Sequence, residues 1–194
     1  MRVHVDKKAI RVLGISESFV KGVSKKSVLA GVVMRGDMLV DGFTFVTATV
    51  GGMDATEAVL KIHRQLDRED VNLLMLNGCV ISWFNVIDLS AVYQKLNLPL
   101  ICVTYEESDG LEKYFRAHFD DWEERVAVHE RNGDRELVKL HTGYSLYSRY
   151  FGMGKISSRR VLNKFTIQGA IPEPIRVSRL LANSMLNAGA IPSA

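Results

Sequence analysis

The stretch Leu73-Leu74-Met75-Leu76-Asn77-Gly78 decides the fold, because a run of apolar residues ends abruptly at a polar one. A short run of this kind is typical of a strand that is buried on both faces in the middle of a parallel sheet. In open α/β sheets, ligands and chemistry gather just beyond the carboxyl ends of such strands. Asn77 therefore marks the place where we look for function. Its amide lacks the anionic oxygen that a hard divalent cation favours.

The segments around this run predict a mixed α/β sheet. Ser27 to Met34 and Leu39 to Val50 are rich in β-branched residues, and Arg35-Gly36-Asp37 lies between them. This arrangement predicts an antiparallel hairpin near the N-terminus. Leu98 to Thr104 repeats the short apolar pattern and predicts a second buried strand. A further strand is predicted at 9–15, weaker strand patterns lie at 137–140 and 145–151, and helices are predicted at 54–66, 86–96, 109–128, 157–165 and 172–189.

Length and composition bound the class of protein. The chain has 194 residues, of which 47% are hydrophobic and 24% charged, and we expect one domain over residues 1–194. No apolar stretch approaches the roughly 18 residues of a membrane span, and the N-terminus lacks the apolar core of a signal peptide. Cys79 and Cys102 lie in apolar runs, so we expect both to be reduced and buried. These features favour a cytoplasmic protein that does not contact membranes.

The charge is distributed unevenly along the chain. From Lys139 onward there are eight basic residues and one acid, which gives 8 − 1 = +7. The remainder has 25 − 8 = 17 basic and 22 − 1 = 21 acidic residues, which gives −4. This asymmetry indicates either a nucleic-acid partner or the packing of two complementary halves on one another. The residues that we expect to bind nucleic acid are Lys155, Arg159, Arg160, Arg176 and Arg179.

Acidic residues near strand ends and helix starts offer a candidate metal site. Glu17 follows the first predicted strand, Asp54 and Glu57 open a helix, and Asp88 lies in the next helix. If these carboxylates clustered, they would bind Mg²⁺ or Mn²⁺, with Glu17 and Asp54 as the first ligands, and activate a water for phosphodiester cleavage. The same residues have structural explanations, because Asp54 and Glu57 fit a helix N-cap pair. Without such a cluster we expect no cofactor.

A segment with two adjacent aromatic residues follows the strand that ends at Asn77. Trp83, Phe84 and Asn85 could line a cleft in which the aromatic rings stack on bases or anchor a partner. Burial of these rings in the core is the alternative explanation. The sequence leaves both open.

Several segments of the chain resemble endonuclease V. Residues 171–182, which read Ile-Pro-Glu-Pro-Ile-Arg-Val-Ser-Arg-Leu-Leu-Ala, are similar to its C-terminal helix, and 73–78 is similar to the strand that carries an aspartate before a glycine. Segments 14–15, 52–56 and 84–88 bring the match closer to an uncharacterised, mainly archaeal family, domain of unknown function ninety-nine, a distant relative of endonuclease V. The resemblance spans nearly the whole chain. It implies a ribonuclease H-like fold, in which a five-stranded mixed sheet of order 3-2-1-4-5 is flanked by helices.

The same resemblance implies that the catalytic positions of endonuclease V are altered here. The aspartate of its first strand falls on Ser16, beside Glu17, and the aspartate before glycine falls on Asn77. A lysine after the fifth strand falls on Tyr105, and a histidine of the last helix falls on Arg179. The glutamate of the set falls on Glu57 or Asp54. Endonuclease V uses a metal-binding acidic set to cut a strand near deaminated bases, so these neutral replacements imply lost or altered catalysis.

Three functions follow as hypotheses. The first is a nucleic-acid-binding or accessory protein on an endonuclease V-like scaffold, with the nuclease site largely lost. The second is an active Mg²⁺- or Mn²⁺-dependent endonuclease whose carboxylates have relocated to Glu17, Asp54, Glu57 and Asp88. The third is a protein-interaction or small-ligand module with a cleft at Trp83 and Phe84.

Overall fold

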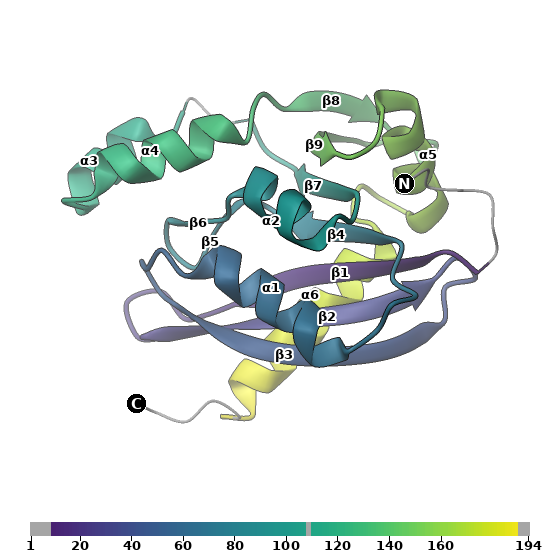
Figure 1. The fold of residues 1–194 in the computed structure, drawn as a ribbon, viewed down its shortest axis with the longest axis horizontal. Helices are drawn as coiled ribbons and strands as arrows, with labels where there is room; N and C mark the ends of the chain where they lie inside the picture. Colours follow the sequence, from purple (N-terminus) through teal and green to yellow (C-terminus); the bar gives the residue numbers. More distant parts are fainter. Residues whose placement is uncertain (1–8, 108–109, 190–194) are drawn as a thin grey trace.

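A seven-stranded mixed sheet lies at the centre of the computed structural model, which describes residues 9–107 and 110–189 (Figure 1). Its strands lie in the order β3-β2-β1-β4-β7-β9-β8. β1, β4 and β7 run parallel, and the remaining neighbours pair antiparallel. A separate hairpin consists of β5 and β6. The strands are β1 (Arg11–Ser18), β2 (Lys26–Arg35), β3 (Val40–Thr49), β4 (Leu73–Asn77), β5 (Val80–Ile81), β6 (Asn85–Val86), β7 (Leu100–Thr104), β8 (Glu136–Lys139) and β9 (Ser145–Phe151).

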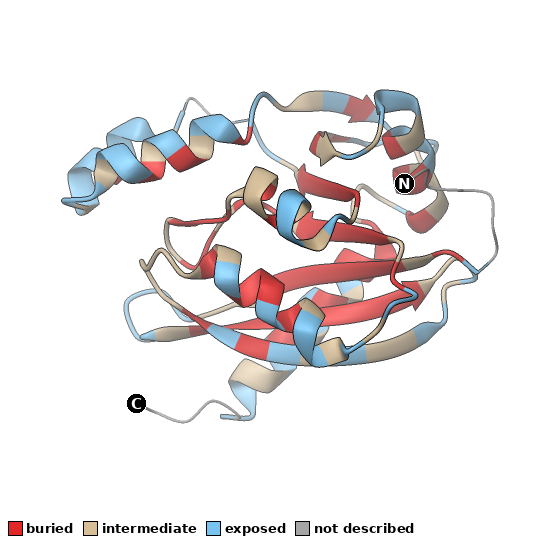
Figure 2. Ribbon diagram, viewed as in Figure 1, coloured by how far each residue is buried: buried red, intermediate tan, exposed pale blue. Residues whose placement is uncertain are grey.

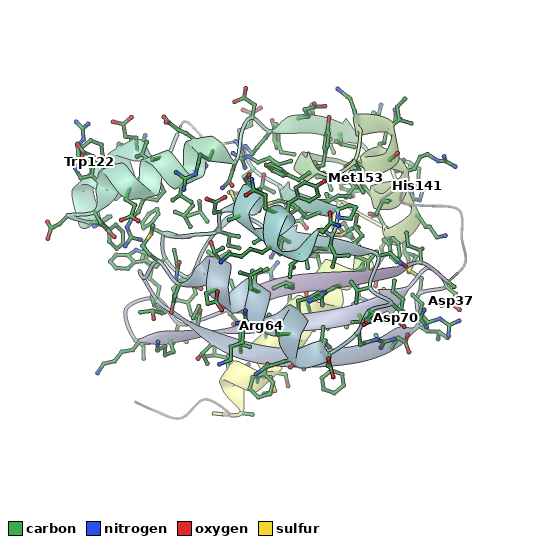
Figure 3. The ribbon with its side chains drawn as sticks, viewed as in Figure 1. Asp37, Arg64, Asp70, Trp122, His141 and Met153 are labelled. Carbon is green, nitrogen blue, oxygen red and sulfur yellow. The ribbon has the colours of Figure 1, made fainter. Side chains whose placement is uncertain are left out.

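Helices cover both faces of the sheet. α1 (Ala55–Leu66) and α2 (Leu89–Leu96) pack on one face, and α5 (Lys155–Phe165) and α6 (Glu173–Asn187) pack on the other. α3 (Glu112–His118) and α4 (Trp122–Arg131) pack on one another and extend away from the sheet. Figure 2 shows the central strands largely buried and this helix pair largely exposed. The labelled Asp37, Arg64 and Asp70 in Figure 3 are exposed charged residues at the surface.

The apolar run that predicted a central strand forms β4. Alternate residues of this strand enter different cores, because successive side chains of a strand point to opposite faces. Leu74 and Leu76 pack under α1 and α2, whereas Leu73 and Met75 pack under α5 and α6. All of them are fully buried, which explains why the sequence shows no alternation of polar and apolar residues.

The last helix approaches the first strand very closely at Gly14. A Cβ atom at this position would lie 2.5 Å from the carbonyl carbon and oxygen of Pro174. Only glycine therefore permits this contact between β1 and α6. The contact joins the two ends of the described chain and fixes α6 across the sheet face.

The structure differs from the sequence predictions in several elements. The sheet has seven strands instead of five, because β9 pairs with β7 and carries β8 beyond it. The helix predicted at 109–128 is two helices, because Phe119 adopts an extended conformation between α3 and α4. Its predicted first residue, Asp109, lies outside the described residues. The helix predicted at 86–96 begins at Leu89, because Val86 pairs with β5 and Asp88 is the N-cap residue.

Both cysteines are free and buried, as predicted. Within 9–107 and 110–189, no helix is long and apolar enough to cross a membrane.

Candidate functional site

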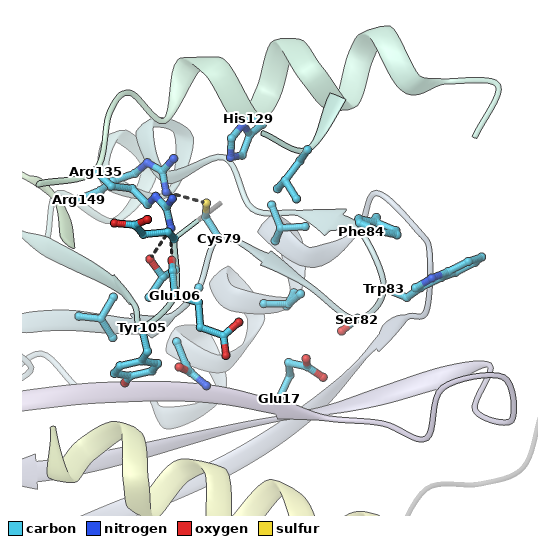
Figure 4. Close-up of a pocket in the computed structure, with 18 of the residues that line it drawn as sticks. Glu17, Cys79, Ser82, Trp83, Phe84, Tyr105, Glu106, His129, Arg135 and Arg149 are labelled. Atoms are coloured by element: carbon cyan, nitrogen blue, oxygen red, sulfur yellow. Dashed lines mark hydrogen bonds between the residues drawn. The ribbon is translucent and has the colours of Figure 1, made fainter. Parts of the chain in front are cut away.

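A pocket of about 650 Å³ opens at the carboxyl ends of the parallel strands (Figure 4). Glu17 lies near the end of β1, Asn77 ends β4 and Tyr105 directly follows β7, and all of them line the pocket. Because β1, β4 and β7 are neighbours in the sheet, these residues lie in a row across it. The pocket is therefore at the strand end that Asn77 marked in the sequence.

Glu17 has a carboxylate oxygen that lacks a partner. Its Oε2 atom is buried and accepts no hydrogen bond. Burial raises the pKa of Glu17, and a backbone hydrogen bond from Ser82 and the nearby charge of Arg179 offset this only in part. A buried polar atom without a partner is destabilising, so its presence in a pocket indicates a role beyond folding.

Tyr105 and Asn77 also have polar groups that no other side chain uses. The Tyr105 hydroxyl is buried without a hydrogen-bond partner, and burial raises the pKa of this residue. The side-chain amide of Asn77 makes no hydrogen bond to any residue in the described part of the chain. The row of strand-end residues thus offers a carboxylate, an amide and a hydroxyl to a ligand.

The other two positions identified by the resemblance, Ser16 and Arg179, lie beside the corner of the pocket that Glu17 and Asn77 form. Ser16 is 2% exposed and attaches α6 to β1, because its hydroxyl donates to the Ile175 carbonyl at 3.1 Å and accepts from the Ser178 hydroxyl at 2.8 Å. Arg179 of α6 lies close enough for its positive charge to oppose the rise in the pKa values of both Glu17 and Tyr105. Ser16, Asn77, Tyr105 and Arg179 therefore surround one corner, where Ser16 has a structural role.

The structure does not assemble the predicted carboxylate set, because Glu17 is the only one of the four predicted carboxylates that lines the pocket. Asp54 accepts hydrogen bonds from the Thr49 amide and hydroxyl and from the Asn85 amide. Burial raises its pKa, but these hydrogen bonds outweigh that effect and leave the pKa lowered.

The remaining two carboxylates also have structural partners. Glu57 is exposed and pairs with Arg64. Asp88 caps α2 by accepting from the Ala91 amide at 2.9 Å, and it pairs with Arg131 at 2.9 Å. The N-cap pair predicted for Asp54 and Glu57 lacks its side-chain bond, because Asp54 occupies the N-cap position of α1 but its side chain caps no helix. Asp88, for which no cap was predicted, is the residue whose side chain caps a helix.

A divalent metal fits these donors poorly. Within 9–107 and 110–189, no three His, Cys, Asp or Glu side chains gather closely enough to hold an ion. The corner itself contributes Glu17 alongside neutral Asn77 and Ser16. A hard dication prefers more anionic oxygen than this corner provides.

Part of the basic C-terminal region is neutralised internally. Lys155 forms an ion pair with Glu136 at 2.7 Å, and Arg176 pairs with Glu173 of its own helix. Arg159 and Arg160 lie on α5 and are exposed. Of the predicted nucleic-acid-binding residues, only Arg179 lies beside the pocket corner.

A strained aromatic turn forms one rim of the pocket. Ser82, Trp83 and Phe84 all have left-handed backbones, with φ values of 46°, 55° and 68°. Each such residue costs about 1 kcal/mol, and strain of this kind collects at functional sites. Trp83 and Phe84 are half-buried and line the pocket, whereas Asn85 is buried and bonds to Thr49, Asp54 and Ala55. The aromatic residues are thus at the cleft, and Asn85 is structural.

Arg125 holds this turn in place. Its guanidinium group is 3% exposed and donates to the carbonyl oxygens of Gly51, Gly52 and Phe84 at 2.8–3.0 Å. It also pairs with Asp121 at 2.7 Å and lies 3.8 Å from the centre of the Phe119 ring. One side chain from α4 therefore ties the turn to the end of β3. The helical spacing of the sequence did not predict this role of Arg125.

Sequence reasoning also missed the charged wall of the pocket. Arg149 lies in β9 and Arg135 precedes β8, both of which showed only weak strand patterns. They line the pocket together with Cys79, Glu106 and His129. No motif could have identified them, because pairing of β9 with β7 brings them to the site.

Comparison with known proteins identifies a matching family model and related sequences. A family model described as Endonuclease dU matches residues 8–186. A UPF0215 protein of Pyrobaculum calidifontis is 38% identical over 174 residues, which cover 89% of this chain and 95% of that protein.

Solved structures extend the similarity to the fold. A protein of unknown function from Archaeoglobus fulgidus has a TM-score of 0.78 at 27% identity, covering 91% of this chain and 98% of that one. The catalytic domain of human endonuclease V has a TM-score of 0.65 at 16% identity, covering 98% of this chain and 89% of that one. At that identity the likeness concerns the fold alone. The predicted resemblance to an archaeal family with an endonuclease V-like structure is confirmed.

Proposed function

Because the chain belongs to the endonuclease dU family, we propose that it recognises DNA containing deoxyuridine, the nucleoside abbreviated dU, in the pocket at the ends of β1, β4 and β7. The observation that carries this proposal is the buried Glu17 oxygen without a partner, in line with the unused polar groups of Asn77 and Tyr105. These groups are available to form hydrogen bonds with a polar ligand.

The size and chemistry of the pocket suit a nucleotide. Its volume of about 650 Å³ lies within the usual range for small-molecule sites. Asn77 carries both a donor and an acceptor, which match the N3–H and the carbonyl oxygens on the edge of uracil. Trp83 and Phe84 at the rim provide faces on which neighbouring bases stack.

The scaffold supports a nucleic-acid role as well. When β1, β2, β3, β4 and β7 are counted as strands one to five, their order in the sheet is 3-2-1-4-5. We propose that this is a ribonuclease H-like sheet to which β9 and β8 have been added at one edge.

Strand cleavage at Glu17 is the second candidate function. The raised pKa of Glu17 favours cleavage, because a carboxyl group whose pKa is nearer neutral pH can take up or release a proton during reaction. The neutral Ser16 and Asn77 favour recognition without cleavage instead. The two candidates share one ligand and differ only in whether the strand is cut.

The test uses fluorescent oligonucleotides that differ at a single base, deoxyuridine or thymidine. We expect tighter binding to deoxyuridine, and we expect both affinities to fall with salt because phosphates contribute. Equal affinity for the two oligonucleotides would contradict the recognition proposal. Denaturing gels of the same mixtures with Mg²⁺, with Mn²⁺ and with chelator report cleavage. Glu17→Gln should abolish a product band if Glu17 transfers the proton, and absence of any band in the unchanged protein leaves recognition as the function.

A further inference from the structure

The pocket wall opposite Glu17 contains two guanidinium groups. Figure 4 shows Arg135 and Arg149 close together beside His129, with Glu17 on the other side of the pocket. Arg149 projects from β9, where it is paired in register with Cys102 of β7. Arg135 comes from the segment just before β8.

Arg149 is buried without a carboxylate partner. It is 7% exposed, its Nε donates to the Gly133 carbonyl at 2.6 Å, and one Nη lies 3.5 Å from the Cys79 sulfur. Arg149 forms no salt bridge anywhere in the part of the chain that the structure describes. A buried charge is costly unless it is paired, so an unpaired guanidinium at a pocket indicates an anion that the protein does not itself provide.

Arg135 is held rigidly by neutral groups. One Nη donates to the Thr104 hydroxyl at 3.1 Å and to the Glu106 carbonyl at 2.9 Å. Its guanidinium group lies 4.9 Å from the centre of the Tyr147 ring. The carboxylate of Glu107 accepts from the Tyr147 hydroxyl at 2.7 Å, and it forms no ion pair with Arg135. The remaining N–H groups of Arg135 are therefore available to a ligand.

The third group on this wall, His129, does not neutralise the arginines. Burial lowers its pKa, and the charges of Arg149 and Arg135 lower it further. Glu106 and Glu107 line the same pocket, but within the described residues neither carboxylate forms an ion pair with Arg135 or Arg149.

We propose that Arg135 and Arg149 form a phosphate-binding site, which takes a phosphate of the bound strand while the nucleotide faces Glu17. Guanidinium groups bind phosphate through paired, charge-assisted hydrogen bonds, and they do so best when their position is fixed beforehand. The choice of a nucleic-acid phosphate as ligand rests on the proposed function. The arginine pair itself does not.

The first test measures inorganic phosphate binding to the full chain by calorimetry and thermal unfolding, with KCl at matched ionic strength as reference. We expect saturable stabilisation by phosphate, and we expect Arg135→Gln and Arg149→Gln each to weaken binding about ten-fold. Arg131→Gln is the matched control, because Arg131 is exposed and pairs with Asp88. If Arg149→Gln fails to fold, Arg149→Lys keeps the charge but loses the planar fork, and it should also bind phosphate more weakly. Phosphate that stabilises no more than KCl, or Arg135→Gln that behaves as the control, would overturn the proposal.

A second readout examines Cys79 as the competing counter-ion. Hydrogen bonding to Cys102 and then the Arg149 charge lower the pKa of the Cys79 thiol to about 7. Thiolate absorbance near 240 nm, taken as the difference from Cys79→Ser, should fall when phosphate binds. A thiolate signal that phosphate leaves unchanged, together with no stabilisation by phosphate beyond that by KCl, would assign the counter-charge to sulfur and overturn the proposal.

The two proposals fail separately. If phosphate binding depends on both arginines but deoxyuridine and thymidine oligonucleotides bind alike, the phosphate site stands and base recognition falls. If deoxyuridine is preferred and Arg135→Gln and Arg149→Gln bind the oligonucleotide normally, the phosphate site falls and base recognition stands.

Discussion

Glu17 illustrates how a single buried carboxyl group can lower the stability of the folded state. A carboxyl group whose pKa is raised in the folded state binds its proton more tightly there than in the unfolded chain. The folded state therefore loses stability as the pH rises from the ordinary value of 4.5 through the raised pKa. The full penalty is present above the raised pKa and absent below the ordinary one.

We predict that Glu17→Gln stabilises the protein near pH 7 by about 1 kcal/mol, the lower end for a buried unsatisfied group. For a chain of this size the melting temperature should rise by roughly 2–4 °C. The gain should disappear near pH 4, where Glu17 is protonated. Thermal unfolding at both pH values measures this. Glu57→Gln is the control and should show no gain, because Glu57 is exposed and its pairing with Arg64 lowers its pKa. An equal response of both variants would argue against a buried charge at Glu17.

Asn77 is the residue that separates this corner from a metal site. We predict that Asn77→Asp gains stabilisation by millimolar Mn²⁺, because a second carboxylate would join Glu17 at the corner. The unchanged protein should melt at the same temperature with and without Mn²⁺. Thermal unfolding across a Mn²⁺ titration gives the result, and Asn97→Asp at the end of α2 is the control. A shift in the unchanged protein would show that the present donors already hold a metal.

At the scale of elements, the contact between β1 and α6 leaves no room for a side chain at Gly14. We predict that Gly14→Ala costs about 3 kcal/mol, because the added methyl group overlaps the Pro174 backbone and neither element can move away cheaply. Urea unfolding measures the loss. Gly154→Ala is the matched control, because a Cβ there meets no atom within 4 Å, and it should cost at most about 1 kcal/mol through the weaker N-cap of α5. Similar losses in both variants would mean that α6 adjusts to the new side chain.

The aromatic turn depends on α4 through Arg125. Removing Arg125 leaves the carbonyl groups of Gly51, Gly52 and Phe84 without their donor. We predict that Arg125→Met costs about 2–3 kcal/mol and changes the fluorescence of Trp83. Arg116→Met is the control, because Arg116 is exposed, pairs with Glu112 and lies over the Trp122 ring, so its loss should be below about 1 kcal/mol. If Trp83 fluorescence is unchanged in Arg125→Met, the turn holds its shape without this residue.

Elements whose signal is local could be predicted from the sequence. The run that forms β4 and the hairpin of β2 and β3 combine strand-forming residues with clear ends, and Asn77 located the pocket because strand ends in such sheets collect ligands. The aromatic turn could not be predicted, because a left-handed Trp83 has no sequence signature and the turn is hydrogen-bonded by Arg125, which is distant in the chain. Arg149 was equally hidden, because its position depends on the pairing of two distant strands.

At the scale of the whole molecule, the basic residues of the C-terminal region differ in whether an acidic residue neutralises them. Lys155 and Arg176 are already paired, whereas Arg179 lies beside the pocket corner. We predict that Arg179→Ala lowers the affinity for DNA and reduces the slope of log affinity against log salt by about one unit, the effect of one lost phosphate contact. Fluorescence anisotropy at several salt concentrations measures the slope. Lys155→Ala should leave it unchanged, and equal slopes for both variants would place the DNA elsewhere.

The contact of the last helix with the first strand also determines when the site can form during synthesis. The hydroxyl groups of Ser16 and Ser178, which are 162 residues apart in the chain, meet at the corner beside Glu17. Chain ends that must find each other late make folding slow, and a ribosome releases the chain from its N-terminus onward. A nascent chain that has already paired β1 with β2 and β4 still lacks Arg179 and the helix that covers this corner. The corner beside Glu17 is therefore complete only after α6 has emerged from the ribosome.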